Sequence, residues 1–530
     1  MNEAPRQGTE LPPRTAARPA ICWWPAAVIL LAAFGVLLWI WGFYGRQRQD
    51  RNLATEITLV LTVALLLLWC LLLSRMRWRW RFAWLGGVAV LIGLTMALFR
   101  MQGVTGDLVP VLRWRWGHSA WSAPDASRPP GSTPTPDPAT GLTNDYPQFL
   151  GPNRNGMVAS PRLARDWKTQ PPQRLWAQPV GTGWSGFAVA GHLAITLEQR
   201  GENETINAYD LLSGSPIWSY PYPAHFQSTL AGEGPRATPT IAGNRVYALG
   251  SSGLLNCLAL DTGKLLWSKD ILRDSQAELE VWGMSSSPLL VNDQVVVSAG
   301  GKNHRSLVAY RAADGEFAWG GGTDGAGYSS PLLADLAGVR QILIFNSGGV
   351  LAHDPSSGEV LWKYHWPGGH PHVSTPVVLP GDRLLVSSGY GVGSELLRVQ
   401  KGTDGKWSAS RIWKSNRLKA KFTNLVYRGD FIYGLDDGIM ACLDATTGEP
   451  KWKYGRYGHG QEILVGDLLL VGAESGEMIL LDPNPQAARE IARFSALHGK
   501  TWNPPALAGQ YLVVRNDKEA ACYRLPLAEP

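Results

Sequence analysis

The chain has 530 residues, of which 45% are hydrophobic and 17% charged, and its formal net charge is +6 at pH 7. Residues 1–116 contain 13 Arg, no Lys and five acidic residues, a net charge of +8, so the remaining residues carry −2. The part after residue 116 has no positive excess for a phosphate backbone, and we therefore expect no nucleic-acid partner.

Three windows near the N-terminus, residues 23–44, 53–74 and 82–99, are nearly free of charged side chains. Each is roughly as long as a helix that spans a bilayer. The first window is not a cleavable signal peptide, because its apolar core is too long and no small-residue cleavage site follows it. We therefore predict a three-helix transmembrane domain over residues 1–116.

Arginine residues indicate the orientation of this domain. The short second connection, RMRWRWR, carries Arg75, Arg77, Arg79 and Arg81, the densest basic cluster in the domain. Positive loops stay on the cytoplasmic side. The cluster favours a cytoplasmic N-terminus and an exported C-terminal domain. We expect the chain to lie in a bacterial inner (cytoplasmic) membrane, with its C-terminal part on the extracytoplasmic or periplasmic side.

A change of composition follows the membrane domain. Residues 117–145 are rich in Pro, Ser and Thr, which is typical of an extended, semi-rigid linker. The next stretch, YPQFLGPNRNG at 146–156, mixes aromatic residues with Gly and Pro. We expect an ordered clasp there, and assign residues 146–182 to a clasp segment followed by a closing strand.

One pattern recurs through the rest of the chain and is clearest in LNCLALDTGKLLWSK, residues 255–269. An alternating apolar run, a polar turn with Gly263 and a Trp four residues later predict a β-hairpin. Such a hairpin cannot bury its apolar face alone, so it is expected to stack on copies of itself.

The spacing of the repeated tryptophans gives the size of one unit. Trp218, Trp267, Trp319, Trp362, Trp413 and Trp452 are separated by 49, 52, 43, 51 and 39 residues. About 40–50 residues correspond to one four-stranded propeller blade. These tryptophans, with Trp176, are expected to pack between neighbouring blades.

Eight repeat starts occur between residues 183 and 527, but the last copy lacks its fourth strand. RLWAQPV, residues 174–180, carries Trp176 in phase with the repeat and supplies that strand. The sequence therefore predicts an all-β, eight-bladed propeller over 183–527, closed by an N-terminal strand that leaves no free sheet edge.

The repeats carry a resemblance to a known family. AYDLLSGSPIW (208–218), LALDTGKLLW (258–267) and CLDATTGEPKW (442–452) resemble the tryptophan-docking repeat of the pyrroloquinoline-quinone (PQQ)-binding-like propellers. YPQFLGPNRNG resembles the opening of bacterial members. The resemblance covers about residues 146–527 and implies either a PQQ- and calcium-dependent dehydrogenase or an outer-membrane-assembly propeller that binds protein partners without a cofactor.

The channel mouth, where the innermost strands begin, distinguishes these two branches. Aligning the repeat starts predicts a set of ligand- or partner-binding residues there: Trp184, Arg236, Tyr328, Phe422, His459, Glu462, Trp502 and Asn503. Calcium requires several oxygen ligands and PQQ requires cations. With one Arg and one acid in this set, we expect no cofactor and no metal, and favour the assembly branch. Aromatic and neutral polar groups suit a protein or peptide partner.

Two further hypotheses remain open in the sequence. The alternative function is a membrane-bound quinoprotein dehydrogenase that oxidises an alcohol or sugar with PQQ and calcium and passes electrons to membrane quinone. The catalytic residues of such an enzyme are not identified by any motif. His365, His370 and His372 form the one histidine cluster and are either a transition-metal site or part of a capping loop, which we favour.

Overall fold

A computed structural model of the protein describes residues 21–45, 47–116, 145–228 and 230–529. The chain forms two compact units, Met1–Gly117 and His118–Pro530. The predicted linker lies outside the described residues except for Asp145.

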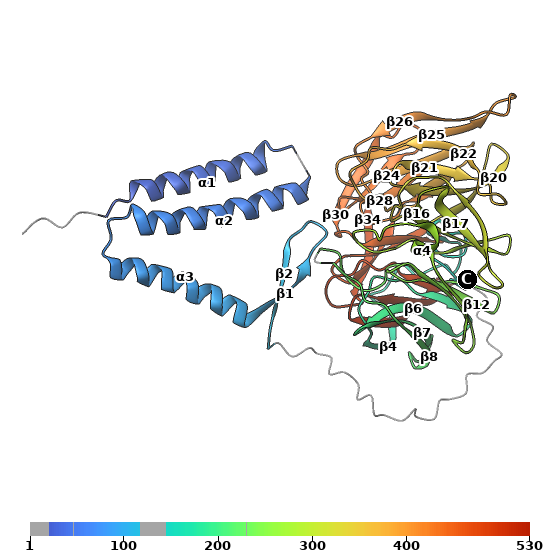
Figure 1. The fold of residues 1–530 in the computed structure, drawn as a ribbon, viewed down its shortest axis with the longest axis horizontal. Coiled ribbons are helices and arrows are strands. Elements are labelled where there is room, and N and C mark those ends of the chain that lie inside the picture. Colours follow the sequence, from blue (N-terminus) through green and yellow to red (C-terminus); the bar gives the residue numbers. More distant parts are fainter. Residues whose placement is uncertain (1–20, 46, 117–144, 229, 530) are drawn as a thin grey trace, which may run out of the picture. The chain divides into compact units, whose positions relative to one another are not determined.

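The first unit contains three helices, α1 (Trp24–Gly42), α2 (Arg48–Leu72) and α3 (Trp78–Leu98), each long and apolar enough to cross a membrane. A hairpin of β1 (Phe99–Val104) and β2 (Pro110–Trp114) follows directly (Figure 1). The second helix begins at Arg48, before the predicted window at 53. Its charged first turn remains helical because Asp50 is favourable near a helix N-terminus and Arg48 Nε lies 3.4 Å from Asp107 Oδ2.

The second unit is built from antiparallel sheets of four strands, which we number in chain order (Figure 1). Sheet 1 consists of β5 (Ala188–Ala190), β6 (Leu193–Arg200), β7 (Asn203–Asp210) and β8 (Pro216–Pro223). Sheet 2 consists of β11 (Thr240–Ala242), β12 (Arg245–Leu249), β13 (Leu254–Ala259) and β14 (Leu265–Asp270). Sheet 3 consists of β15 (Leu289–Val291), β16 (Gln294–Gly301), β17 (Arg305–Arg311) and β18 (Phe317–Gly321). Sheet 4 consists of β19 (Leu332–Leu336), β20 (Val339–Asn346), β21 (Gly349–His353) and β22 (Val360–His365).

The remaining sheets continue the pattern. Sheet 5 consists of β23 (Val377–Leu379), β24 (Arg383–Ser388), β25 (Gly393–Lys401) and β26 (Trp407–Ser415), and sheet 6 of β27 (Val426–Arg428), β28 (Phe431–Asp436), β29 (Ile439–Asp444) and β30 (Pro450–Arg456). Sheet 7 consists of β31 (Gln461–Val465), β32 (Leu468–Gly472), β33 (Glu477–Asp482) and β34 (Arg489–Ser495), and it gains the short parallel strand β3 (Met157–Val158) as a fifth strand. Sheet 8 consists of β35 (Ala506–Ala508), β36 (Tyr511–Arg515), β37 (Glu519–Arg524) and β4 (Gln173–Pro179). Outside these sheets lie the hairpin β9 (Gln227–Ser228) and β10 (Gly232–Glu233) and the short helix α4 (Ile271–Ser275).

The sheets are joined into a propeller through their buried faces. Apolar residues of adjacent sheets form shared core clusters, and the innermost strands β35 and β5 bring the last sheet into contact with the first. The N-terminal strand β4 completes sheet 8, pairing antiparallel with β37, and Trp176 lies opposite Cys522. The predicted propeller fold is confirmed, and the strand that completes the last sheet is the predicted one.

The repeated tryptophans lie between neighbouring sheets. Five of them donate the indole N–H to a backbone carbonyl of the next sheet, at 2.8–3.0 Å: Trp176 to Leu211, Trp218 to Leu260, Trp267 to Ala312, Trp413 to Ala445 and Trp452 to Asn484. Trp319 and Trp362 instead donate to Gln294 and Gln341 of their own sheets, both at 2.6 Å. The repeated glycine has a physical role here. A Cβ on Gly315 would lie 2.8 Å from the Trp267 ring, and the backbone there has φ +74°. Gly214, Gly263, Gly358 and Gly448 meet the rings of Trp176, Trp218, Trp319 and Trp413 in the same way, so five of the seven indoles lie against a turn that favours glycine.

Residues 146–158, which we call the clasp, are ordered against the innermost strands. The backbone of Tyr146 exchanges hydrogen bonds with Val189 of sheet 1, and Met157 and Val158 pair in parallel with Leu464 and Val465 of sheet 7. Arg154, in the same segment, is buried. One short segment thereby contacts sheets that are more than 250 residues apart in the chain.

Candidate functional site

Four of the predicted mouth residues meet in one aromatic cluster, made of Trp184, Phe422, His459 and Trp502. The ring centroids of Trp184 and Trp502 are 4.8 Å apart, those of Phe422 and Trp502 are 5.3 Å apart, and those of Phe422 and His459 are 5.4 Å apart. Phe422 and Trp502 remain half-buried, whereas Trp184 and His459 are buried. Each residue lies a few positions before the first residue of an innermost strand. The four strands belong to sheets 1, 6, 7 and 8, which the propeller brings together.

Two lysines lie over this aromatic cluster. Lys500 Nζ is 4.7 Å from the ring centroid of Trp184 and 4.1 Å from that of Trp502. Lys421 Nζ is 5.3 Å from the Phe422 ring and 5.2 Å from the Tyr390 ring. Burial lowers the pKa of the Lys500 ammonium. The mouth therefore combines aromatic faces with positive charge held in cation–π geometry.

Hydrogen bonds fix the backbone and rings of the cluster. Glu474 accepts from the Trp502 indole N–H at 2.8 Å and from the His459 backbone N–H at 3.1 Å. Gln461 Nε2 donates to the carbonyls of Phe422 at 2.8 Å and Trp502 at 3.2 Å. Asn503, also predicted here, lies beneath the cluster, where its Nδ2 donates to Ser185 O at 2.8 Å. A recognition surface held in this way loses little conformational entropy when a partner binds.

Arg236 and Tyr328 form a separate group at the mouth. The Arg236 guanidinium lies 4.8 Å from the Phe226 ring centroid and donates to the carbonyl of Ala231 at 3.0 Å, and burial lowers its pKa to about 10. Tyr328 packs against Trp282 with ring centroids 5.4 Å apart and the rings tilted by 33°, and burial raises the pKa of Tyr328 to about 12. Arg236 is thus committed to holding its own loop.

Glu462, predicted as the acid of the mouth, lies between sheets 6 and 7. Its Oε1 is 3.3 Å from the position that a Cβ on Gly434 of β28 would occupy, and the side chain is fully buried. Burial raises the pKa of this carboxyl well above its ordinary value. Successive residues of a strand point to opposite faces, and residue 462 of β31 points toward the neighbouring sheet 6. This carboxyl therefore lies among packed strands and not in the aromatic cluster.

Replacing Glu462 with glutamine should stabilise the fold increasingly as pH rises. A raised folded-state pKa means that the native carboxyl keeps its proton after the unfolded carboxyl has lost it. The free energy of unfolding therefore falls as pH rises above the pKa of this carboxyl in the unfolded chain. The fall is about 1.4 kcal/mol per pH unit for one group. Melting temperatures of wild type and Glu462→Gln between pH 5 and 8.5 should diverge, while the exposed control Glu359→Gln should not. A difference that is constant with pH would contradict this assignment.

The three histidines do not converge on one point. His372 is buried, with Nδ1 2.7 Å from Asn346 O and its ring stacked on Phe345 at 4.3 Å. His370 stacks on Tyr390 at 5.3 Å, and His365 is exposed on β22. The described residues contain no group of three or more His, Cys, Asp or Glu side chains placed to hold a metal ion. His372 and His370 are thus held against aromatic rings of neighbouring segments, and the capping role of this loop stays a prediction.

The acidic and basic side chains near the mouth decide how well it suits calcium and PQQ. Bound calcium needs several oxygen ligands together. Glu474 is committed to Trp502 and His459, and Glu462 lies between packed strands. Arg236 holds its own loop, and the ammonium groups of Lys421 and Lys500 lie beside the aromatic rings. The residues present do not fit a PQQ–calcium pair.

Sequence reasoning missed Tyr390, Glu474 and Trp282. Tyr390 lies in the turn between β24 and β25, and Glu474 in the turn between β32 and β33. Because strands alternate in direction, the turn between the second and third strands of a blade returns to the mouth. Adding those turns to the alignment would have found the first two residues.

Residues 202–454 match the family described as outer membrane protein assembly factor BamB. The chain is 27% identical over 287 residues to BamB of Moranella endobia (strain PCIT), which covers 51% of this chain and 67% of that protein. It is 25% identical over 293 residues to BamB of Burkholderia pseudomallei (strain K96243), covering 53% and 71%.

Solved structures share the fold. BamB from Moraxella catarrhalis superimposes with a TM-score of 0.50 at 18% identity, covering 68% of this chain and 99% of that chain. Quinohemoprotein alcohol dehydrogenase from Comamonas testosteroni gives 0.53 at 12% identity, covering 73% and 82%. The chain therefore resembles PQQ-like propellers and is nearer, in sequence, to the BamB proteins than to the dehydrogenases.

Proposed function

We propose that this protein is a membrane-anchored extracytoplasmic scaffold whose propeller binds a protein or peptide partner at the channel mouth. The observation that carries this proposal is the aromatic cluster with its two overlying lysines. Trp and Tyr dominate the binding energy of many protein interfaces, and half-buried rings on a fixed backbone suit such contacts. Sequence similarity to outer membrane protein assembly factors also supports a scaffold that binds protein partners.

The membrane domain holds the scaffold at the surface of the inner membrane, with the propeller on the periplasmic side. The support is the set of three apolar helices and the arginine-dense connection before α3. An alkaline phosphatase reporter fused after residue 145 should be active, because that enzyme matures outside the cytoplasm. If this fusion is inactive, and a reporter that works only in the cytoplasm is active when fused at the same position, the proposed orientation is wrong.

A PQQ-dependent dehydrogenase is the competing function, and calorimetry separates the two. The full chain in detergent should show no saturable heat with PQQ and calcium at micromolar concentrations. An unpaired buried charge is costly, and among the residues that the structure describes no three His, Cys, Asp or Glu side chains are placed to hold a metal ion. Dye-linked oxidation of alcohols and sugars should stay at background. A tight, calcium-dependent isotherm that Arg236→Ala abolishes would make the dehydrogenase the better account.

A further inference from the structure

The innermost strands of the propeller share one backbone position that faces the centre. In a short antiparallel strand, alternate residues pair with the second strand, and the residue between them directs its N–H and C=O to the free edge. In β5 this residue is Val189, since Ala188 and Ala190 lie on either side of it. The same register gives Ile241 in β11 and Leu464 in β31.

The clasp uses this free edge on three sheets. Val189 N donates to Tyr146 O at 2.8 Å, and Tyr146 N donates to Val189 O at 3.0 Å. Ile241 N donates to Pro147 O and Leu464 N to Gly156 O, both at 2.8 Å. The clasp is therefore an extended segment that binds by adding its backbone to the inner edges of the sheets.

A buried arginine anchors the clasp on sheet 3. Arg154 donates to the carbonyls of Ser287 and Pro288, each at 2.9 Å, and to Gln148 Oε1 at 3.1 Å. With this contact the clasp reaches sheet 3 as well as sheets 1, 2 and 7, although on sheet 3 it bonds the carbonyls before the strand and not the free edge.

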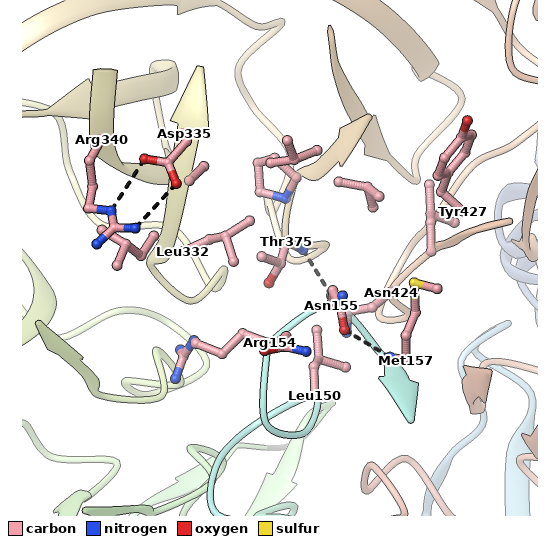
Figure 2. Close-up of a pocket in the computed structure, with 17 residues that line it drawn as sticks. Leu150, Arg154, Asn155, Met157, Leu332, Asp335, Arg340, Thr375, Asn424 and Tyr427 are labelled. Atoms are coloured by element: carbon pink, nitrogen blue, oxygen red, sulfur yellow. Dashed lines mark hydrogen bonds and ion pairs between the residues drawn. The ribbon is translucent and has the colours of Figure 1, made fainter. Parts of the chain in front are cut away.

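Sheets 4, 5 and 6 present the same edge to a pocket. The equivalent residues are Leu333, Val378 and Tyr427, and all three line a pocket of about 330 Å³ beside the clasp (Figure 2). Their side chains are half-exposed, whereas Val189, Ile241 and Leu464 are buried. Within the described residues, the clasp makes no backbone hydrogen bond to Leu333, Val378 or Tyr427.

The walls of the pocket indicate what it would accept. Apolar side chains from the clasp and from three sheets line most of it: Leu150, Met157, Leu332, Pro376 and Leu425. Asp335 and Arg340 stand at one side and pair with each other at 3.3 Å, as Figure 2 shows. A positively charged side chain at the centre of the pocket would be buried beside Arg154, which also lines it, and this is costly.

We propose that this pocket binds a short extended peptide segment of a partner protein, with uncharged, mainly apolar side chains. Its backbone pairs with the inner edges of β23 and β27, as the clasp pairs with β5 and β31. The site is separate from the aromatic cluster, which precedes the innermost strands, and the inference does not depend on what the mouth binds.

Hydrogen–deuterium exchange of the full chain in nanodiscs tests the open edges first. The amides of Leu333, Val378 and Tyr427 should exchange much faster than those of Val189, Ile241 and Leu464. Equal protection in the purified chain would mean that its own residues already pair with these edges, and the proposal would be overturned.

Selection from a random heptapeptide library against the full chain then tests the binding itself. Enriched sequences should be apolar and should protect the Val378 and Tyr427 amides from exchange. Asn153→Trp, which fills the pocket from an exposed position on the clasp, should weaken binding at least tenfold. The matched control Pro152→Trp, on the same loop but outside the pocket, should change it less than twofold.

A backbone variant separates pairing from simple filling. Val378→Pro removes the N–H that faces the pocket and should weaken peptide binding roughly fivefold or more. Leu290→Pro makes the same change at the equivalent position of sheet 3, outside the pocket, and should leave binding unchanged. The proposal would be overturned if the wild-type chain enriched no peptides relative to the Asn153→Trp protein. It would also be overturned if the Val378→Pro and Leu290→Pro proteins, at equal stability, bound the peptides equally well.

Discussion

Replacing Trp267 with alanine is expected to lower the free energy of unfolding of the propeller by about 3–5 kcal/mol. The indole is buried, lies against the turn of the next sheet and donates to Ala312 O at 3.0 Å. Its loss leaves a cavity between sheets 2 and 3 and removes one of the hydrogen bonds to the Ala312 carbonyl, which also accepts from Arg245 Nη1 at 3.1 Å. Denaturant unfolding of the full chain in detergent, followed by near-ultraviolet circular dichroism, measures the effect.

Two further variants sharpen this test. Leu266→Ala changes the neighbouring residue, which is 42% exposed, and should cost within about 0.5 kcal/mol. Gly315→Ala places a Cβ against the indole and should be strongly destabilising in wild type. In the Trp267→Ala background only the left-handed strain remains, about 1–2 kcal/mol, so the two changes should not add. Additive costs, or a Trp267→Ala protein as stable as Leu266→Ala, would contradict the docking role.

Deleting residues 146–182 should cause the chain to aggregate. This deletion removes β4, which leaves the edge of β37 unpaired, and it removes the clasp from the inner edges of sheets 1, 2 and 7. Long unpaired edges template pairing with other chains. Light scattering and size-exclusion chromatography should report aggregates, accompanied by a lower melting temperature.

A deletion of residues 120–140 is the control, because it leaves both β4 and the clasp in place. A synthetic peptide covering residues 171–182 should restore part of the lost stability by pairing with β37. If the 146–182 deletion stays monodisperse and melts at the wild-type temperature, strand closure does not hold the propeller together.

The fold could be predicted from sequence because its signal is local and repeated. The spacing of glycine and tryptophan, as in Gly315 and Trp319, recurs in five units and indicates both the turn and the strand that follows it. Trp176 identified the closing strand because it keeps the same phase although it lies at the other end of the array. Helix ends were less exact, since the charged first turn of α2 is stabilised by Asp107, far along the chain.

The candidate site was only partly predictable. Alignment of the repeat starts gave the positions of Trp184, Phe422, His459 and Trp502, which do meet. It could not show that Glu462 turns between two sheets, because one residue of strand alternation decides the direction of a side chain. The pocket beside the clasp has no sequence signature, because its walls come from four segments that only the closed propeller brings together.

Photo-crosslinking in cells that express the chain natively tests the central claim most directly. A photoreactive residue at position 422 lies in the aromatic cluster, and one at Leu212, which is 41% exposed, lies on a turn at the opposite end of sheet 1. The account predicts discrete protein adducts from position 422 that Trp502→Ala strongly reduces at unchanged melting temperature, and none of these adducts from position 212. The same adducts from both positions, or adducts from position 422 that Trp502→Ala does not affect, would contradict partner binding at the channel mouth.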